Sequence, residues 1–390
     1  MTQYQTKLVG TSHNGWGALA ALPAEVAKFQ AQRVLIVTDP FLAQSGLADQ
    51  IKAQLLGCGC EVFINSEVVA EPPLAVGERL VADTKALNCD LVIGLGGGSA
   101  IDLAKLVAVL ATHEGLVADY LNLSGHKQLS NKGLPTIMIP TTSGTGSEVT
   151  NISVLSLASS KDVIAHDYLL ADVAIVDPEL TVTVPAKVTA ATGIDALTHA
   201  VEAYVSVNAN PITDAFALQA ITLISGALRQ AVANGADRQA RSDMSYGSYL
   251  AGVAFFNAGV AGVHALAYPL GGQFHLSHGE SNAVLLPYVM DHIRSACADR
   301  LRTAYHAMGF EVAALSAEEA SVRCVAALRE LVRDVGIAQS LQAYGIEAAA
   351  IASLTTDALK QTRLLARSPM LLDEAAVTSI YQAAWQGLVD

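Results

Sequence analysis

Asp195 and His199 are two residues whose chemical type and spacing suit metal binding. They lie in segment 190–204, whose pattern predicts a helix, so their side chains emerge one turn apart on the same face. A carboxylate and an imidazole on one face can bind the same ion. A histidine on a helix is more often a core or surface residue, so the pair alone does not decide between these interpretations.

A second segment, 264–278, contains His264, His275 and His278 among several glycines. One carboxylate with two or three imidazoles suits a divalent transition metal that keeps an open position for a substrate. Together with the first pair, the segment therefore predicts a catalytic metal site. On spacing alone, the three histidines are equal candidates for its ligands.

A glycine-rich loop follows a predicted strand at 91–94. Gly97, Gly98 and Ser99 come directly before or at the start of a predicted helix, 99–111. Consecutive glycines let backbone N–H groups approach an anion, and the helix N-terminus adds the positive end of a dipole. This predicts a pyrophosphate cradle, although the loop lacks the usual Gly-x-Gly-x-x-Gly fingerprint. A tight strand–helix turn is the alternative.

Asp39 stands at the end of the first predicted strand, 33–38. An acidic side chain there can accept hydrogen bonds from ribose hydroxyls, and it disfavours a 2′-phosphate. In the usual fingerprint the acidic residue follows the glycines, whereas here it precedes them. We therefore expect a variant of the dinucleotide-binding fold. A solvated turn residue before Pro40 is the alternative.

A third loop, 140–150, is rich in hydroxyl side chains and again follows a predicted strand. Thr141, Thr142 and Thr145 suit contacts with the nicotinamide ribose or with phosphate. Taken alone, a cluster of Ser, Thr and Gly is usually only a loop. Three such loops at the carboxyl ends of strands, where open α/β sheets bind ligands, predict a dinucleotide site.

The elements that must position these residues change in character along the chain. Strands and helices alternate over the first 180 or so residues, which predicts a largely parallel sheet covered by helices on both faces. The predicted strands are 33–38, 61–65, 91–94, 134–139 and 173–177, and the predicted helices between them are 40–56, 74–87 and 99–111. After residue 187 helical periodicity dominates, for example at 211–234, 242–256, 316–335 and 348–365. We expect a Rossmann-like α/β domain, 1–184, followed by an all-helical metal-binding domain, 185–390.

Composition narrows the class of protein. The chain has 390 residues, 52% of them hydrophobic, which is enough for two packed domains. A net charge of −13 argues against general nucleic-acid binding. The N-terminus lacks the apolar core of a signal peptide and no long uncharged apolar run occurs, so we expect neither secretion nor a membrane span. Five cysteines without zinc-ribbon spacing favour buried thiols in a reducing cytoplasm.

With these residues in view, the chain resembles the iron-containing (group III) alcohol dehydrogenase family over essentially its whole length. The motifs that carry the resemblance are Gly96-Gly-Gly-Ser-Ala-Ile-Asp-Leu-Ala-Lys105, Pro140-Thr-Thr-Ser-Gly-Thr-Gly-Ser-Glu-Val149, Asp177-Pro-Glu-Leu-Thr181, Gly193-Ile-Asp-Ala-Leu-Thr-His-Ala-Val-Glu202 and His264…His278-Gly. The resemblance implies an NAD(P)-binding α/β domain, a helical domain and a catalytic metal in the cleft between them. It also implies a homodimer, because dimers are common in the family.

The resemblance implies particular site residues. It places the metal on Asp195, His199, His264 and His278, which leaves His275 out of the set. Iron(II) is the usual ion of the family, and an imidazole-rich site also accepts zinc. An aspartate in the place of Asp39 resembles members that prefer NAD over NADP. The implied contacts with NAD are made by Asp39, Gly97, Gly98, Ser99, Thr141, Thr142, Thr145, Lys161, Leu180 and Thr181.

Tyr268 departs from the family pattern. Many members carry a second histidine four residues after the third metal ligand, and this chain has Tyr268 there. A tyrosine can still form a hydrogen bond or relay a proton, but its ordinary pKa near 10 suits neutral pH less well than that of an imidazole. We retain Tyr268 as the candidate catalytic residue for proton transfer.

These residues predict an iron- and NAD-dependent alcohol dehydrogenase or aldehyde reductase that acts on a short alcohol, diol or hydroxy acid. A metal lowers the pKa of bound water from about 15.7 to about 7, which favours the oxyanion by on the order of 10 kcal/mol. The metal is therefore expected to contribute more than a general base. Phe255 and Phe256 suggest an apolar wall of the substrate site, although packing between helices explains them equally well.

Three other functions remain open at this point. A metal- and NAD-using lyase of the dehydroquinate synthase type would need basic residues to bind a phosphate, for which Arg229, Arg238 and Arg241 are candidates. A metallohydrolase would leave the glycine loop without a purpose, and no hydrolase motif supports it. A non-catalytic binding protein is the third.

Overall fold

The computed structural model describes residues 3–157 and 161–387. The chain forms two compact units. We call the first the α/β unit, which comprises Leu8–Thr142 and Gly146–Thr181. We call the second the helical unit, which comprises Val182–Asp390 with Ser143–Thr145 and Met1–Lys7.

The α/β unit is built on a six-stranded parallel sheet with the order β1-β8-β5-β4-β2-β3. The strands are β1 (Thr11–Asn14), β2 (Arg33–Val37), β3 (Glu61–Asn65), β4 (Leu91–Gly96), β5 (Thr136–Pro140) and β8 (Val173–Val176). In β2, β4, β5 and β8 almost every residue is buried, as expected where helices cover both faces of a parallel sheet. The predicted parallel α/β fold is confirmed.

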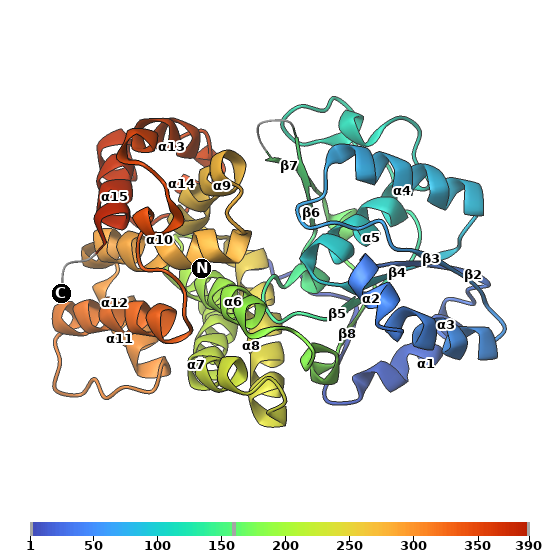
Figure 1. The fold of residues 1–390 in the computed structure, drawn as a ribbon, viewed down its shortest axis with the longest axis horizontal. Helices are drawn as coiled ribbons and strands as arrows, with labels where there is room; N and C mark the ends of the chain where they lie inside the picture. Colours follow the sequence, from blue (N-terminus) through green and yellow to red (C-terminus); the bar gives the residue numbers. More distant parts are fainter. Residues whose placement is uncertain (1–2, 158–160, 388–390) are drawn as a thin grey trace. The chain divides into compact units, whose positions relative to one another are not determined.

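Helices lie on both faces of this sheet. Figure 1 shows α4 and α5 on one side of the strands and α1 and α3 on the other. The helices of the unit are α1 (Leu22–Lys28), α2 (Pro40–Gln44), α3 (Leu47–Gly57), α4 (Leu74–Leu87) and α5 (Gly98–Leu110). The apolar stretch from Leu91 onward is a buried strand, a turn and a buried helix, as predicted.

Short elements of the α/β unit escaped the sequence prediction. β1 and the antiparallel pair β6 (Ile152–Ser156) and β7 (Lys161–Ala165) have only four or five residues each. The predicted helix 40–56 is two helices, because Gly46 adopts a left-handed conformation with a φ of 85° between α2 and α3. Glycine takes this conformation without the steric cost that other residues incur.

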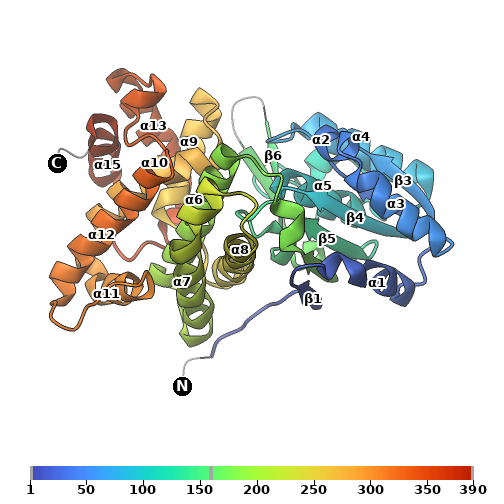
Figure 2. The same ribbon diagram turned by 60° about the horizontal axis from the view of Figure 1, so that its bottom comes forward.

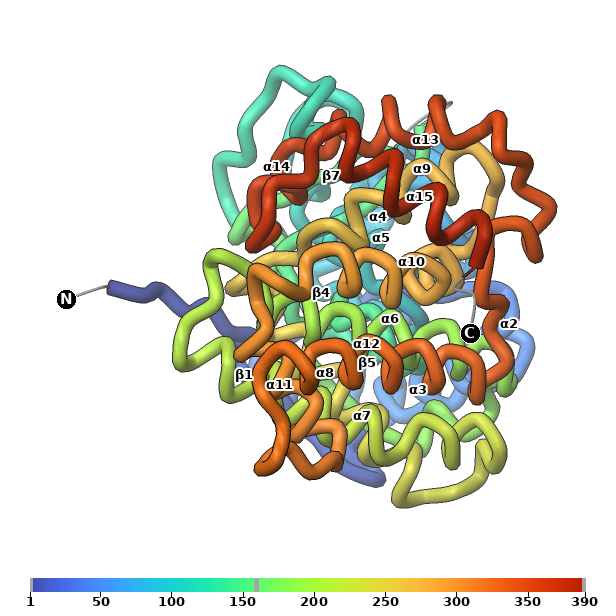
Figure 3. The backbone as a smooth tube through the Cα atoms, turned by 90° about the vertical axis from the view of Figure 1, so that its left-hand side faces the viewer, coloured from blue at the N-terminus to red at the C-terminus, as the bar shows by residue number. Residues whose placement is uncertain are grey.

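All the regular elements described in the helical unit are helices. Figure 2 shows α6, α7 and α8 together, and Figure 3 brings α11, α12 and α15 into view. The helices are α6 (Ala186–Val205), α7 (Pro211–Ala233), α8 (Arg238–Ala258), α9 (Gly262–Phe274), α10 (His278–Ile293), α11 (Ala298–Ala307), α12 (Ala317–Asp334), α13 (Ile351–Ala358), α14 (Thr362–Leu365) and α15 (Glu374–Gln386). Their apolar faces form one core. The all-helical prediction is confirmed.

Two details of the helical unit bear on the sequence analysis. The predicted helix 348–365 is broken, since α13 ends at Ala358 and α14 starts at Thr362. Among the described residues, α7 is the one single helix long and apolar enough to cross a membrane, and α8 with α9 would form a second span only if counted as a pair bent by 104°. Ile221, Ile224 and Leu228 of α7 belong to the core, so this is weak evidence for a membrane span.

Candidate active site

α6 presents three polar side chains along one buried stripe. Asp195, His199 and Glu202 lie at positions i, i+4 and i+7, which align on one face of a helix. All three are buried, and Glu202 is 0% exposed. Burying this many polar groups is costly unless each has a partner, so a stripe of this kind indicates a functional site.

The other two candidate ligands start from helix ends. His264 is the third residue of α9, and His278 is the first residue of α10. His275, between them, ends α9 in a left-handed conformation with a φ of 55° and is exposed. His275 does not belong to the group of candidate ligands that the structure brings together.

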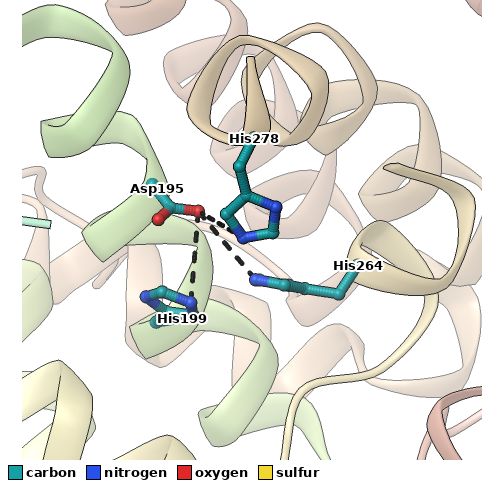
Figure 4. A group of neighbouring side chains, drawn as sticks. All are labelled: Asp195, His199, His264 and His278. Carbon is teal, nitrogen blue, oxygen red and sulfur yellow. Dashed lines mark ion pairs between the residues drawn. The ribbon is translucent and has the colours of Figure 1, made fainter. Parts of the chain in front are cut away.

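Figure 4 shows three imidazoles, from α6, α9 and α10, whose ring nitrogens face the carboxylate of Asp195. The Nε2 atoms of His199, His264 and His278 lie 4.0, 3.9 and 3.6 Å from Asp195 Oδ1. One donor atom from each of the four residues lies within 4.8 Å of the donors of the other three. Donor atoms bound to one transition ion at about 2.1 Å have spacings of this order, so the set fits iron(II) or zinc.

Hydrogen bonds at the far side of two rings hold them in the metal-binding tautomer. His199 Nδ1 donates to the carbonyl of Gly144 at 3.2 Å, and His264 Nδ1 donates to Glu202 Oε2 at 2.6 Å. Glu202 Oε1 also accepts the backbone N–H of Val263 at 2.7 Å. With Nδ1 protonated, Nε2 keeps its lone pair toward the site, as is usual for metal-binding histidines.

Electrostatics favour the protonation states that a cation requires. Burial lowers the pKa of His199 from 6.5 to about 4, so its imidazole is neutral at physiological pH. Burial acts to raise the pKa of Asp195, but His199, His278, His264 and the amide of Asn282 together lower it. A neutral imidazole and an ionised carboxylate are the forms that bind a divalent ion.

Aromatic side chains border this group. The ring of Phe255 stacks on His199 with centroids 4.2 Å apart, which gives the site an apolar wall at this point. Tyr268 lies one turn beyond His264 on α9, and its ring centroid is 6.2 Å from that of His278. The candidate proton-transfer residue is therefore beside the candidate ligands.

The loops predicted to bind NAD meet at one edge of the parallel sheet. The register pairs Val37 with Gly94 and Gly96 with Pro140, so β2, β4 and β5 end side by side. Asp39 Oδ1 accepts the N–H of Leu42 at 2.9 Å and so caps α2.

The glycine loop and the hydroxyl loop lie against each other at this edge. A side chain at Gly97 would meet Thr142 Oγ1 at 3.5 Å, and the N–H of Thr141 donates to Gly96 O at 2.9 Å. Gly98 and Ser99 form the first turn of α5, whose N-terminal N–H groups suit a phosphate.

The remaining predicted contacts with NAD lie outside the glycine loop and the start of the hydroxyl loop. Thr145 belongs to the helical unit by its contacts, beside the Gly144 carbonyl that accepts from His199. Lys161 starts β7 and forms an ion pair with Glu71 at 2.9 Å. Leu180 and Thr181 lie in a 3₁₀ turn after β8, where Thr181 Oγ1 donates to Pro178 O.

A buried network fixes the hydroxyl loop. Lys105 is fully buried, and its Nζ donates to Ser147 O at 2.9 Å and to Thr150 Oγ1 at 3.3 Å. It also pairs with Asp102, which accepts from the Ser147 hydroxyl and from the N–H of Val154. The end of the glycine motif is thereby tied to the threonine-rich loop.

Sequence reasoning missed three residues that complete the site. Glu202 supports His264, Asn282 Nδ2 donates to Asp195 Oδ1 at 2.7 Å, and the carbonyl of Gly144 supports His199. The spacing of Glu202 from His199 and of Asn282 from His278 could have found two of them, since both spacings return to the ligand face of a helix. A backbone carbonyl carries no such signal.

The arginines considered for phosphate binding have structural roles where the structure shows their contacts. Arg241 is buried and donates to Gly235 O, Val184 O and the Thr189 hydroxyl. Arg229 is paired with Asp334 at 2.9 Å. None of these contacts involves a candidate metal ligand.

Comparison with known proteins identifies the family. The profile described as iron-containing alcohol dehydrogenase matches residues 11–178, and the profile of the C-terminal region of the same family matches residues 189–385. The long-chain-alcohol dehydrogenase 1 of Geobacillus thermodenitrificans is 63% identical over 378 residues, which are 97% of this chain and 96% of that protein. The chain belongs to the iron-containing alcohol dehydrogenase family.

Other members of the family are also similar to this chain in sequence and structure. The 1,3-propanediol dehydrogenase of Klebsiella pneumoniae is 38% identical and covers 95% of this chain and 96% of its own length. A crystal structure of 1,3-propanediol oxidoreductase superposes with a TM-score of 0.94 at 37% identity, covering 98% of this chain and all of that one. Sulfoacetaldehyde reductase of Bifidobacterium kashiwanohense, solved with NAD⁺, gives a TM-score of 0.89 at 28% identity, covering 98% of this chain and 99% of that one.

Family membership confirms the predicted class of function. Iron-containing alcohol dehydrogenases are oxidoreductases that use NAD and iron, and the group Asp195, His199, His264 and His278 is a metal site of the expected composition. The dehydroquinate synthase type of lyase is not favoured by these comparisons.

Proposed function

We propose that this enzyme oxidises long-chain alcohols to aldehydes with NAD⁺ and iron(II), and catalyses the reverse reduction. The observation that supports the substrate class is the 63% identity, over 97% of the chain, to a long-chain-alcohol dehydrogenase. The short alcohols, diols and hydroxy acids expected from sequence become secondary substrates in this proposal. The convergent group of one carboxylate and three imidazoles supports the chemistry.

The donor atoms of the candidate metal ligands are oriented toward one another before a substrate binds. Asp195, His199, His264 and His278 would hold iron(II), which when bound would supply a Lewis acid for the substrate oxygen. Glu202 and the Gly144 carbonyl keep the rings of His264 and His199 oriented, so no reorientation is needed during the reaction. We assign Tyr268 to the proton path, with solvent.

The dinucleotide is assigned to the carboxyl edge of the parallel sheet. The N-terminal N–H groups of α5, at Gly98 and Ser99, suit the pyrophosphate, and Thr141 and Thr142 suit hydroxyl contacts. Asp39 suits the adenosine ribose and repels a 2′-phosphate. NAD is therefore preferred over NADP.

One apolar side chain at the metal centre suits an alkyl chain. The ring of Phe255 stacks on His199 with centroids 4.2 Å apart, so apolar surface adjoins one of the candidate ligands.

A series of linear primary alcohols tests the substrate class. Burial of one methylene contributes about 0.8 kcal/mol, so kcat/KM with saturating NAD⁺ should rise about fourfold per carbon until the apolar surface is filled. The measurement is NADH formation with Fe²⁺-loaded enzyme from ethanol to hexadecanol. A maximum at two to four carbons, followed by a decline, would overturn the proposal while leaving the family assignment intact.

We further propose that the enzyme is a homodimer of the reducing cytoplasm. All five cysteines are free and four of them are buried, which suits a compartment that keeps thiols reduced. Light scattering during size-exclusion chromatography should give twice the chain mass of 40.6 kDa. A mass equal to one chain would contradict the dimer.

A further inference from the structure

Lys161 and Glu71 form an ion pair at the carboxyl edge of the parallel sheet. Lys161 Nζ lies 2.9 Å from Glu71 Oε1, and the two side chains are 13% and 36% exposed. Glu71 belongs to the loop 66–73, which leaves the carboxyl end of β3 and leads into α4. The N–H of Ser156 donates to Pro72 O at 2.9 Å, and Ser156 pairs with Lys161 between β6 and β7. These contacts hold Lys161 beside the loop that follows β3.

Lys161 supplies a positive charge that the loops at this edge lack. No lysine or arginine occurs in the segments that follow β2, β3, β4 and β5, which are 38–39, 66–73, 97 and 141–151. The charged residues of these segments are all acidic, namely Asp39, Glu67, Glu71 and Glu148. The dinucleotide assigned to this edge carries two negative phosphates, so a cation within reach of them favours its binding. Lys161 is joined to one of these segments and can supply that cation.

Glu71 has two unusual features on which the ion pair bears. Its backbone lies in the left-handed region with a φ of 50°, which is costly for a residue other than glycine and is found often at functional sites. Its Oε1 atom is buried and, among the described residues, has no hydrogen-bond partner. A buried carboxylate oxygen is costly without a nearby cation, so the charge of Lys161 balances it. A phosphate group would compete with this oxygen for the same cation.

We propose that Glu71 competes with the phosphates of NAD for Lys161 and thereby weakens cofactor binding. Lys161 is paired with Glu71 in the free enzyme and with the pyrophosphate in the complex. When only a fraction of the enzyme has Lys161 available, the apparent Kd of the cofactor rises by the inverse of that fraction. Weaker binding also speeds the release of NADH, and product release limits kcat in many enzymes. The inference rests on the proposed NAD site and is independent of the long-chain substrate.

Fluorescence titration of the full-length protein with NADH tests the competition. Glu71→Gln should lower the Kd of NADH by about three- to tenfold, because Lys161 loses its competing partner. Lys161→Met should raise the Kd by at least about threefold, because the phosphates lose a cation. In the double variant, Glu71→Gln should have no further effect, because Glu71 acts only through Lys161.

The sign and the coupling of these effects separate the proposal from its alternatives. If Glu71→Gln raised the Kd, Glu71 would position Lys161 for the cofactor and the proposal would be overturned. It would also be overturned if Glu71→Gln lowered the Kd equally with and without Lys161, since Glu71 would then repel the cofactor directly. Glu67→Gln is the matched control, because Glu67 lies on the same loop in an exposed ion pair with Arg79 at 3.2 Å. It should change the Kd less than about twofold, and an effect as large as that of Glu71→Gln would contradict a role specific to Glu71.

ADP and adenosine give a readout that does not depend on the Lys161→Met variant. In competition with NADH, Glu71→Gln should bind ADP more tightly than the wild type and adenosine equally well, because adenosine carries no phosphate. Equal tightening of both ligands would overturn the proposal even if Lys161→Met failed to fold. If Lys161→Met bound NADH as tightly as the wild type, the NAD site would stand and the inference would fail. A wild type that bound no NADH would reject both.

Discussion

Glu202 adds a second carboxylate to the metal centre, 2.6 Å from the ring of His264. Counting Asp195 alone, a divalent ion would leave the centre with a charge of about +1. When Glu202 is included, the net charge of the centre is zero. Arg367 interacts electrostatically with Glu202 and Tyr268, and its charge brings the net charge back to about +1. A net positive centre favours the developing oxyanion, so we expect Arg367 to contribute to catalysis through its charge.

Glu202→Gln should weaken metal binding by about 10- to 100-fold, the usual effect of losing a carboxylate behind a metal-binding histidine. Glutamine can accept from only one of the two donors, the His264 ring and the Val263 N–H, so its NH₂ group faces the other. Chelator competition with Zn²⁺ measures the affinity. Thr198→Val is the control on the same helix, because the buried Thr198 hydroxyl donates to Ile194 O within α6. Equal affinities in Glu202→Gln and the wild type would contradict the supporting role.

Asp39→Asn should shift the cofactor preference toward NADP. The carboxylate repels a 2′-phosphate, and removal of that charge should raise kcat/KM for NADP⁺ relative to NAD⁺ by about tenfold or more. Asparagine is as good a helix cap as aspartate, so the bond to Leu42 N and the stability of α2 are retained. Initial rates with both cofactors measure the ratio, and Asp39→Ala, which also loses the cap, separates charge from capping. An unchanged ratio would show that Asp39 is only a cap.

At the scale of elements, the sequence predicts those whose pattern is long and regular. α4 matches its prediction at both ends, and β3 and β4 begin where expected, because buried strands and amphipathic helices leave strong periodic signals. β1, β6 and β7 were missed, because polar residues interrupt or replace the continuous apolar run that marks the equally short β2 and β8. The prediction of one helix at 348–365 was wrong. Its composition favours a helix throughout, whereas the chain turns between α13 and α14 and both helices pack on the core.

The ligands of the candidate site were predictable from residue type and spacing, whereas the contacts between its elements were not. Asp195 and His199 were predicted as a pair because their spacing places them on one face of a helix. The support of His199 by Gly144 joins residues 55 apart in the chain, and that of Asp195 by Asn282 joins residues 87 apart. Such contacts depend on how α6 packs against a loop and against α10, which local periodicity does not encode.

The hydroxyl loop carries a buried acid that makes stability depend on pH. Burial raises the pKa of Glu148 from 4.5 to about 7, while Lys105 acts in the opposite direction. The unfolded chain releases this proton near pH 4.5 and the folded protein near pH 7, so the contribution of Glu148 to stability is full below pH 4.5 and is lost as pH rises to 7. The loss is about 3 kcal/mol at 1.36 kcal/mol per pKa unit.

Glu148→Gln should therefore stabilise the protein at pH 8, by about 1–3 kcal/mol, and have little effect at pH 4.5. Urea unfolding at both pH values measures the difference in free energy. Glu179→Gln, on an exposed turn of the same unit, is the control and should change neither value. A Glu148→Gln effect of equal size at both pH values would show that packing, and not ionisation, is responsible.

At the scale of the molecule, the candidate metal site and the candidate NAD site belong to two different units. The four candidate metal ligands, Glu202 and Asn282 all belong to the helical unit. The glycine loop, Asp39, Thr141 and Thr142 belong to the α/β unit. Each ligand should therefore stabilise the unit that binds it, because a ligand that binds only the folded form raises its stability by mass action.

Hydrogen exchange followed by mass spectrometry tests this division. Zn²⁺ without NAD⁺ should slow exchange in α6, α9 and the start of α10, by up to about 4 kcal/mol of opening free energy at a thousandfold excess over Kd. NAD⁺ without metal should slow exchange where β2, β4 and β5 end and in the first turn of α5. In His264→Ala the effect of Zn²⁺ should vanish and that of NAD⁺ should persist. If instead NAD⁺ alone slowed exchange in α6 and α10 as strongly as at the sheet edge, the two units would not bind their ligands independently.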